Sequence, residues 1–402
     1  MASTKEYKSK KLQINSKVIL FVVAIILVAM TLRTPLTVVG PITSFIRDGL
    51  GISNVLAGFL TTIPLLAFAI VSPFAPRVAA RFGMEWTLFY SVILLTFGII
   101  LRSLGTTSLL LLGTVLIGIA ISFGNVLIPS FFKMKYPLHI GLLTGIYTVA
   151  MNLSSGLGAG VSYPIANTTV GWQGALAVAL IVTIAATLFW IPQLRGEKVK
   201  LSSGTTKGAG WSTLIRSPLA WAVMFAMGLQ SFIFYTTAAW IPEIYIAQGV
   251  DAANAGWLFS VMQFAQIPMT FITPIIAAKL TTQRPLVLVF SAFYLIGFTG
   301  VLMEWTDYAV VWMIFLGLAG GSSFGLAMML FTLRTRTAYE AAELSGFAQS
   351  IGYLLAAIGP TCFGFIKDVT GSWFVPNMIF IAIAIALLIS GLIAGSNKTI
   401  HE

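Results

Sequence analysis

Long apolar stretches recur along the whole chain and are separated by short polar loops. A helix needs roughly 20 predominantly apolar residues to cross the hydrocarbon core of a bilayer. We therefore predict an all-α membrane protein with twelve transmembrane helices, whose boundaries carry an error of a few residues. The predicted spans cover residues 18–42, 52–74, 86–104, 108–131, 140–163, 173–193, 218–240, 254–276, 284–303, 307–331, 344–366 and 373–395.

The composition excludes a soluble or a disordered protein. Of the 402 residues, 58% are hydrophobic and only 9% are charged, whereas soluble domains average about 45–50% apolar and about 25% charged residues. The first apolar run is too long for the core of a signal peptide, so we interpret it as a retained first span. The single cysteine, Cys362, allows neither an intramolecular disulfide nor a thiolate metal cluster.

The distribution of basic residues predicts the orientation. If the N-terminus is cytoplasmic, the inner segments hold 19 of the 23 basic residues and the outer loops hold Arg47, Arg102 and Lys367. Cytoplasmic loops of membrane proteins carry such an excess of Lys and Arg. We therefore expect a multi-pass protein of the bacterial inner membrane with both termini cytoplasmic. This explanation of the net charge of +11 removes the need for nucleic acid as a partner.

The longest polar connection, residues 195–217, is charged and rich in Gly, Ser and Thr, which is typical of a flexible linker. It divides the chain into an N-terminal six-helix bundle (1–194) and a C-terminal six-helix bundle (218–402).

The two halves also repeat each other at a nearly constant offset. With an offset of about 201 residues, Ser122-Phe123-Gly124 falls on Ser323-Phe324-Gly325, and two inner-loop lysines fall on two arginines. Parallel repeats of this kind occur in transporters that bind their substrate between the halves, near the bilayer midplane.

Six motifs sharpen this interpretation, and as a set they run over nearly all spans. They are TLRTPLTVVGP (Thr31–Pro41), AGFLTTIPLLAFAIVSPFAPRVAARFG (Ala57–Gly83), GNVLIPSFFK (Gly124–Lys133), LLTGIYTVAMNLSSGLGAG (Leu142–Gly160), GLQSFIFYTTAAWIPE (Gly228–Glu243) and LSGFAQSIGYLLAAIGP (Leu344–Pro360). Together they resemble the cyanate and 2-nitroimidazole transporter family of the major facilitator superfamily (MFS). The resemblance implies the MFS fold of two six-helix bundles and a small solute such as cyanate or a nitroimidazole.

Arg33 is the most informative residue. It lies about 15 residues into the first span, which is about 23 Å at 1.5 Å per residue and so past the midpoint of the membrane. All twelve acidic residues fall in predicted loops or at span ends, so an exogenous anion is a natural counter-ion for this guanidinium. The alternative is a structural arginine that caps carbonyls or extends towards the membrane surface. Thr37 lies four residues further on and shares the same helix face.

Further polar residues within the spans are candidates for the walls of one cavity. Gln349 and Tyr353 are four residues apart on one face, and at the offset of 201 they correspond to Thr148 and Asn152. The alternative is hydrogen bonding between helices, which also uses such residues in lipid. The candidate substrate-binding set is Arg33, Thr37, Asn125, Tyr147, Asn152, Tyr235, Gln263, Gln349 and Tyr353, with Gln230 and Gln266 as weaker candidates.

These features predict a secondary transporter that moves a small anion or compact polar solute by alternating access. The alternative within the same fold is an exporter of neutral or aromatic drugs such as nitroimidazoles. We expect no enzyme activity, no catalytic residues, no cofactor and no metal, because the two histidines lie in an inner loop and in the tail and no acidic pair lies in a span. The expected partners are the small solute and the lipid bilayer, and the chain is expected to be a monomer.

Overall fold

The structure is a computed structural model that describes residues 16–52, 54–195 and 210–401. The described residues form helices and turns without any strand. The basic N-terminal segment and most of the predicted linker lie outside the described residues.

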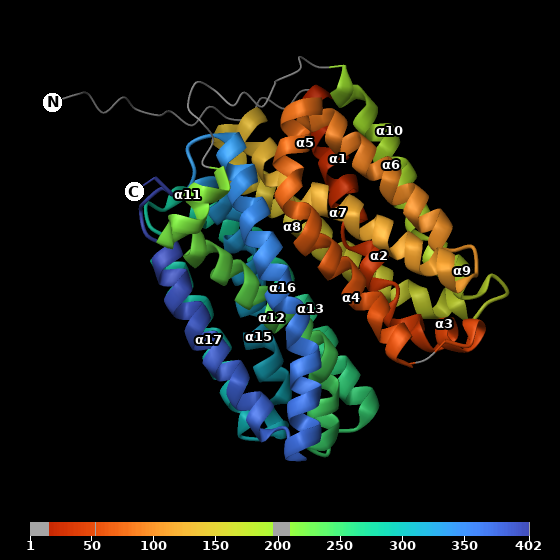
Figure 1. Ribbon diagram of the computed structural model, residues 1–402. Coiled ribbons are helices and arrows are strands. Elements are labelled where there is room, and N and C mark those ends of the chain that lie inside the picture. The colour runs from red at the N-terminus through yellow and green to blue at the C-terminus, as the bar shows by residue number, and fades with distance from the viewer. Residues whose placement is uncertain (1–15, 53, 196–209, 402) are drawn as a thin grey trace.

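The helices form an N-terminal and a C-terminal bundle (Figure 1). The N-terminal bundle contains α1 (Ser16–Thr31), α2 (Thr34–Thr37), η1 (Gly40–Ile42), α3 (Thr43–Leu50), α4 (Asn54–Val71), η2 (Ser72–Phe74), α5 (Ala75–Phe82), α6 (Met84–Arg102), α7 (Thr107–Lys135), η3 (Pro137–His139), α8 (Ile140–Ala166), α9 (Gly171–Ala177) and α10 (Ala179–Leu194). After a short helix, α11 (Gly210–Arg216), the C-terminal bundle contains α12 (Pro218–Ala247), α13 (Ala252–Lys279), α14 (Arg284–Leu302), η4 (Thr306–Tyr308), α15 (Ala309–Leu333), α16 (Ala338–Thr370) and α17 (Phe374–Ala394).

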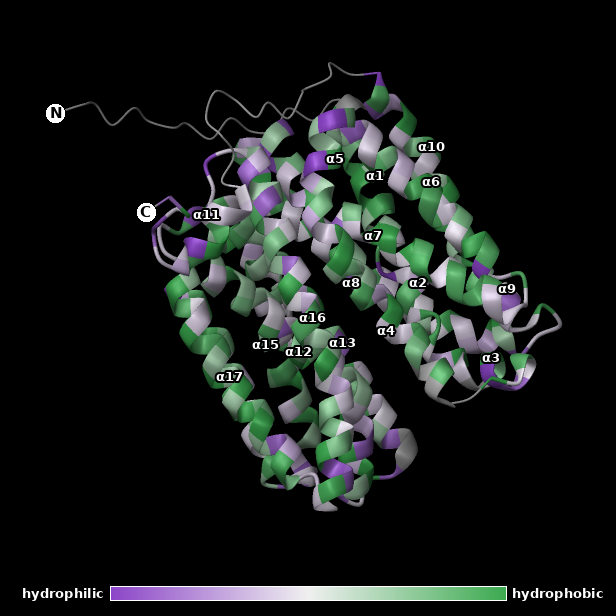
Figure 2. Ribbon diagram, viewed as in Figure 1, coloured by the Kyte–Doolittle hydropathy of each residue, from purple (hydrophilic) through white to green (hydrophobic). Residues whose placement is uncertain are grey.

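The predicted membrane fold is confirmed. Twelve helical segments of the described chain are long and apolar enough to cross a membrane, and each overlaps one of the predicted spans. Figure 2 shows apolar residues along most of their length and polar residues gathered at the ends. The largest difference in length is in the eleventh span, where the helix covers Ala338–Thr370 instead of 344–366. The first and last turns of this helix contain polar residues, so hydropathy did not assign them to the span.

The first span is not one continuous helix. Helix α1 ends at Thr31, and Leu32 and Arg33 form a turn before α2 begins at Thr34. Pro35 is the physical reason, because proline has no N–H to donate and its ring clashes with the carbonyl four residues earlier. The break places the backbone of Arg33 at a helix end inside the bundle instead of in a regular helix wall.

Part of the predicted flexible linker is helical. In α11, Leu214 is fully buried, and the Trp211 ring lies 5.6 Å from the ring of Phe347 on α16. Apolar contacts therefore hold this end of the linker against the C-terminal bundle.

The two bundles are packed together at the end where α1 begins and α17 ends, which we call the base (Figure 1). Thr148 and Asn152 of α8 donate to Thr270 of α13, Gln349 of α16 donates to the backbone carbonyl of Asn125 at 3.0 Å, and the Ser350 hydroxyl donates to the Ala69 carbonyl. All of these residues lie in the half of their helices nearer the base, and the bundles diverge towards the opposite end.

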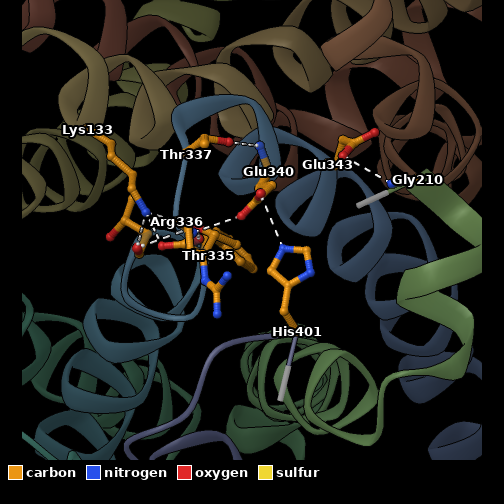
Figure 3. A network of polar contacts seen from close by, with 10 residues as sticks. Lys133, Gly210, Thr335, Arg336, Thr337, Glu340, Glu343 and His401 are labelled. Atoms are coloured by element: carbon orange, nitrogen blue, oxygen red, sulfur yellow. Dashed lines mark hydrogen bonds and ion pairs between the residues drawn. The ribbon is translucent and has the colours of Figure 1, made fainter. Parts of the chain in front are cut away.

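A polar network at the base surrounds the start of α16 (Figure 3). Lys133 of α7 donates across the bundle interface to the Thr332 carbonyl at 2.7 Å, to the Thr335 hydroxyl at 3.0 Å, and to the Thr335 carbonyl. Glu340 accepts from the Arg336 backbone N–H at 2.8 Å and forms a 3.2 Å pair with His401 of the C-terminal tail.

Candidate functional site

A cavity lies between the bundles and encloses about 520 Å³, including the space open to solvent. Its walls are polar and aromatic, and most of them belong to the C-terminal bundle. The lining residues are Arg33, Asn152, Gln230, Ser231, Ile233, Phe234, Tyr235, Thr237, Met262, Gln266, Tyr294, Phe298, Leu316, Gly320, Phe324 and Tyr353. Arg33 and Asn152 are the two contributions of the N-terminal bundle.

Arg33 is 8% exposed and has no hydrogen-bond or ion-pair partner for its guanidinium within the described chain. Two aromatic rings of the C-terminal bundle cover the group instead. Its central carbon lies 5.0 Å from the centroid of Phe234 on α12 and 5.1 Å from that of Phe324 on α15. Aromatic faces attract a cation through the ring quadrupole, so they stabilise the charge without occupying its N–H donors.

Three tyrosines lie within electrostatic reach of Arg33. Tyr235 and Tyr353 line the cavity, and the Tyr353 ring also packs 5.0 Å from the ring of Phe68. Tyr147 is fully buried behind the wall, with its hydroxyl 3.5 Å from the Asn125 side-chain oxygen. The hydroxyls at the wall are neutral donors and acceptors that can bind the remaining polar atoms of a solute held by Arg33.

The cavity brings together four of the nine candidate residues, namely Arg33, Asn152, Tyr235 and Tyr353. The other five lie outside its lining. Thr37 donates to the Arg33 carbonyl at 3.2 Å, and Gln349 is fully buried between the Asn125 carbonyl and the Ser345 hydroxyl. Gln263 accepts from Gln266, while Asn125 and Tyr147 face each other in the core.

Gln230 and Gln266, which were the weaker candidates from the sequence, line the cavity. Four aromatic lining residues were not among the candidates, namely Phe234, Tyr294, Phe298 and Phe324. The glutamines carried a signal, since an amide within a span needs a partner. These four aromatic residues carried none, because an apolar span contains many rings and only the fold shows which of them face the cavity.

Arg102 corrects a further expectation. The sequence placed it at the outer end of the third predicted span and grouped its charge with an outer loop; it is the last residue of α6, but its side chain is only 1% exposed. One guanidinium nitrogen, Nη1, donates to the Pro35 carbonyl of α2 at 2.7 Å. Because a buried carbonyl at a helix end needs a donor, the arginine is drawn into the bundle instead of extending into water.

A membrane protein of two six-helix bundles around a central cavity lined by polar and aromatic residues is typical of solute transporters. The cavity lining in the described chain contains no carboxylate, histidine or cysteine. A model of the Major Facilitator Superfamily matches residues 21–360, and the chain belongs to this superfamily. It is therefore a transporter of small solutes and not an enzyme.

Three relatives match over most of their length. An uncharacterized transporter of Bacillus subtilis is 43% identical, with 95% of this chain and 94% of the relative covered. The 2-nitroimidazole transporter of Escherichia coli is 36% identical, with 95% and 97% covered. The cyanate transport protein of Escherichia coli is 25% identical, with 87% and 90% covered. The predicted resemblance to the cyanate and 2-nitroimidazole transporter family is thereby confirmed.

The fold also matches solved structures. A proton:xylose symporter bound to 6-bromo-6-deoxy-D-glucose superposes with a TM-score of 0.78, at 14% identity, over 96% of this chain and 98% of the symporter. At this identity the likeness concerns the fold alone.

Proposed function

We propose that the protein moves a small anion, cyanate-like or carboxylate-like, through the central cavity at Arg33. One observation carries the proposal, which is that the Arg33 guanidinium lines the cavity with no acid and no hydrogen-bond acceptor bound to it in the described chain. A buried charge is costly unless it is paired, so an anion in contact with Arg33 would be stabilised.

The surroundings of Arg33 support a compact, planar or linear anion. Phe234 and Phe324 cover the charge at 5.0 and 5.1 Å without accepting its N–H groups. The planar guanidinium thus keeps its donors for a carboxylate or another small acceptor, which it binds in two-pronged geometry.

We also propose that transport proceeds by alternating access between the two bundles, in the bacterial inner membrane and as a monomer surrounded by lipid. The excess of basic residues on the base supports a cytoplasmic base, with both termini in the cytoplasm. In that orientation the described state is closed to the cytoplasm and directed outwards. Release of the solute to the inside then requires the contacts at the base to open.

The relatives are consistent with this proposal. One is named a cyanate transport protein, and cyanate is a small linear anion that a guanidinium can bind.

Uptake of radiolabelled cyanate into proteoliposomes tests the anion role. We expect Arg33→Ala to lower the initial rate at least about tenfold, and Arg33→Lys to restore part of it, because lysine keeps the charge but loses the planar fork. Lys279→Ala, which removes an exposed cation at the base, is the matched control and is expected to leave uptake unchanged. Equal uptake by the wild type and Arg33→Ala across cyanate, acetate, nitrate and benzoate would reject the proposal.

The alternative function, export of neutral aromatic compounds such as nitroimidazoles, also has a supporting observation. Six aromatic residues line the cavity, namely Phe234, Tyr235, Tyr294, Phe298, Phe324 and Tyr353. The 36% identical relative is named a 2-nitroimidazole transporter. If this alternative is right, Arg33→Ala keeps 2-nitroimidazole efflux from loaded vesicles, while Tyr294→Ala reduces it.

A further inference from the structure

A second buried arginine, Arg102, contacts the same broken helix that carries Arg33. Its Nη1 donates to the Pro35 carbonyl at 2.7 Å, two residues from Arg33. The side chain is 1% exposed, and its Nε and Nη2 atoms have no partner in the described chain. Burying a guanidinium with only one of its donors hydrogen-bonded costs free energy. Space filling alone is therefore a poor explanation for Arg102.

The Arg102 contact supplies a hydrogen-bond donor to a carbonyl that the break in the first span leaves without one. Helix α2 ends at Thr37, and the carbonyls in the last turn of a helix have no donor within that helix. Arg102 supplies a donor to one of them from the end of α6. A charged donor forms a stronger and more directional bond than a neutral one.

Helix α6 is a rigid support for this bond. Helices α6 and α7 approach closely at two glycines, and a methyl group on Gly113 would lie 2.5 Å from the Gly98 carbonyl oxygen and 2.6 Å from the Arg102 nitrogen. On another side α2 packs against α8, where a methyl group on Gly158 would lie 3.1 Å from the Thr37 hydroxyl. The four-residue helix is therefore fixed by α8 through close packing and by α6 through one charged hydrogen bond.

We infer that Arg102 is a positioning residue that holds α2, and with it the Arg33 guanidinium, at the wall of the central cavity. Its effect on solute affinity rests on the proposed anion role of Arg33, but its effect on the order of α2 does not. Arg102 acts through the Pro35 carbonyl and does not line the cavity.

The test that is independent of the solute uses hydrogen–deuterium exchange in lipid nanodiscs. In Arg102→Met, we expect amide exchange in a peptide covering residues 34–42 to rise about tenfold, which corresponds to the loss of one charged hydrogen bond. Exchange in α10 and α17 is expected to stay unchanged. Ser103→Ala is the matched control, because Ser103 follows Arg102 directly and its hydroxyl donates to the Ile99 carbonyl of α6.

Thermal stability separates positioning from a structural role. Arg102→Met also removes two unpaired buried donors, so we expect its unfolding temperature to stay near that of the wild type. Unchanged exchange over residues 34–42, or an equal rise in every helix, overturns the inference. If Arg102→Met does not fold, Arg102→Lys, which keeps one donor, is judged by the same peptide and the same two outcomes.

Cyanate binding, measured by thermal shift, then links the two arginines. We expect Arg102→Met to weaken cyanate binding about tenfold in the wild-type background and to have no further effect in Arg33→Ala. Additive effects in the double variant overturn the link between Arg102 and Arg33. If Arg33→Ala alone leaves cyanate binding unchanged, the proposed anion function fails, and the exchange experiment still decides the role of Arg102.

Discussion

The guanidinium carbon of Arg33, on the N-terminal bundle, lies 5.0 Å from the centroid of the Phe234 ring on the C-terminal bundle. This contact joins the candidate solute-binding cation of one half to an aromatic ring of the other. It also gives the charge some stabilisation while the site contains no anion.

Removing the ring should therefore destabilise the empty protein more than the loaded one. We expect Phe234→Leu to lower the free energy of unfolding by about 1–2 kcal/mol, because a desolvated cation–π contact is worth roughly that much. A bound anion neutralises Arg33, so cyanate should raise the unfolding temperature of the variant more than that of the wild type. Thermal unfolding in detergent measures both values. Phe97→Leu, at an exposed position of α6, is the control, and equal cyanate-induced shifts in the two proteins would contradict the prediction.

Lys133 should control how easily the base opens. It donates to the Thr332 and Thr335 carbonyls at the end of α15 and so bonds across the bundle interface in the network of Figure 3. We expect Lys133→Met to increase the separation of the bundles at the base, since hydrogen bonds to a charged donor contribute about 1.5–3 kcal/mol. Double electron–electron resonance (DEER) measures this distance between spin labels attached to cysteines introduced at the exposed positions Phe82 and Leu280, in a Cys362→Ser background. Lys398→Met, an exposed lysine near the same network, should leave the distance distribution unchanged, and an unchanged distribution in Lys133→Met refutes the role.

Close packing at the base gives a test that uses one helix as its own control. A methyl group on Gly141 of α8 would lie 2.7 Å from the Ala278 side chain and 2.8 Å from the Pro274 carbonyl oxygen of α13. Gly141→Ala should wedge the bundles apart and disfavour the closed base. Gly160→Ala on the same helix has nothing within 4 Å, so it should be neutral or slightly stabilising, since alanine is the better helix former by about 1 kcal/mol. Transport rate and base separation are the readouts, and equal behaviour of the two variants argues against the wedge.

The ion pair between Glu85 and Lys135 should contribute to stability through the cost of breaking it. The two groups lie 2.9 Å apart, with the Glu85 side chain 7% exposed and the Lys135 side chain 25% exposed. Glu85→Gln leaves a partly buried lysine without its counter-ion, so we expect a loss of about 1–3 kcal/mol, less than for a fully buried pair. The double variant Glu85→Gln/Lys135→Gln should recover part of this loss in thermal unfolding. No recovery would show that the pair does not act as a unit.

Much of the fold could be predicted from the sequence because the bilayer imposes one strong length requirement. All twelve spans satisfied it, and the offset between Ser122-Phe123-Gly124 and Ser323-Phe324-Gly325 indicated two similar halves. A proline within a span predicts a kink, but Pro35 alone does not show whether the helix bends or, as here, stops after Thr31.

The cavity was harder to predict, because helix periodicity shows which residues share a face but not which face meets the other bundle. Gln349 and Tyr353 share a face of α16, yet Tyr353 lines the cavity while Gln349 is sealed against the Asn125 carbonyl. The burial of Arg102 could not be predicted for a related reason, since a charged side chain at a span end extends into water unless a group inside the fold binds it.

The network at the start of α16 has a practical consequence for work on the protein. The His401 side chain pairs with Glu340 at 3.2 Å, and the Ile400 N–H donates to the Arg334 carbonyl at 3.0 Å, so the tail is part of the contact set beside Lys133. An affinity tag fused directly after Glu402 would disturb the contacts of His401 and Ile400 and so bias measured transport rates. Purification handles belong at the other terminus, or behind a long spacer.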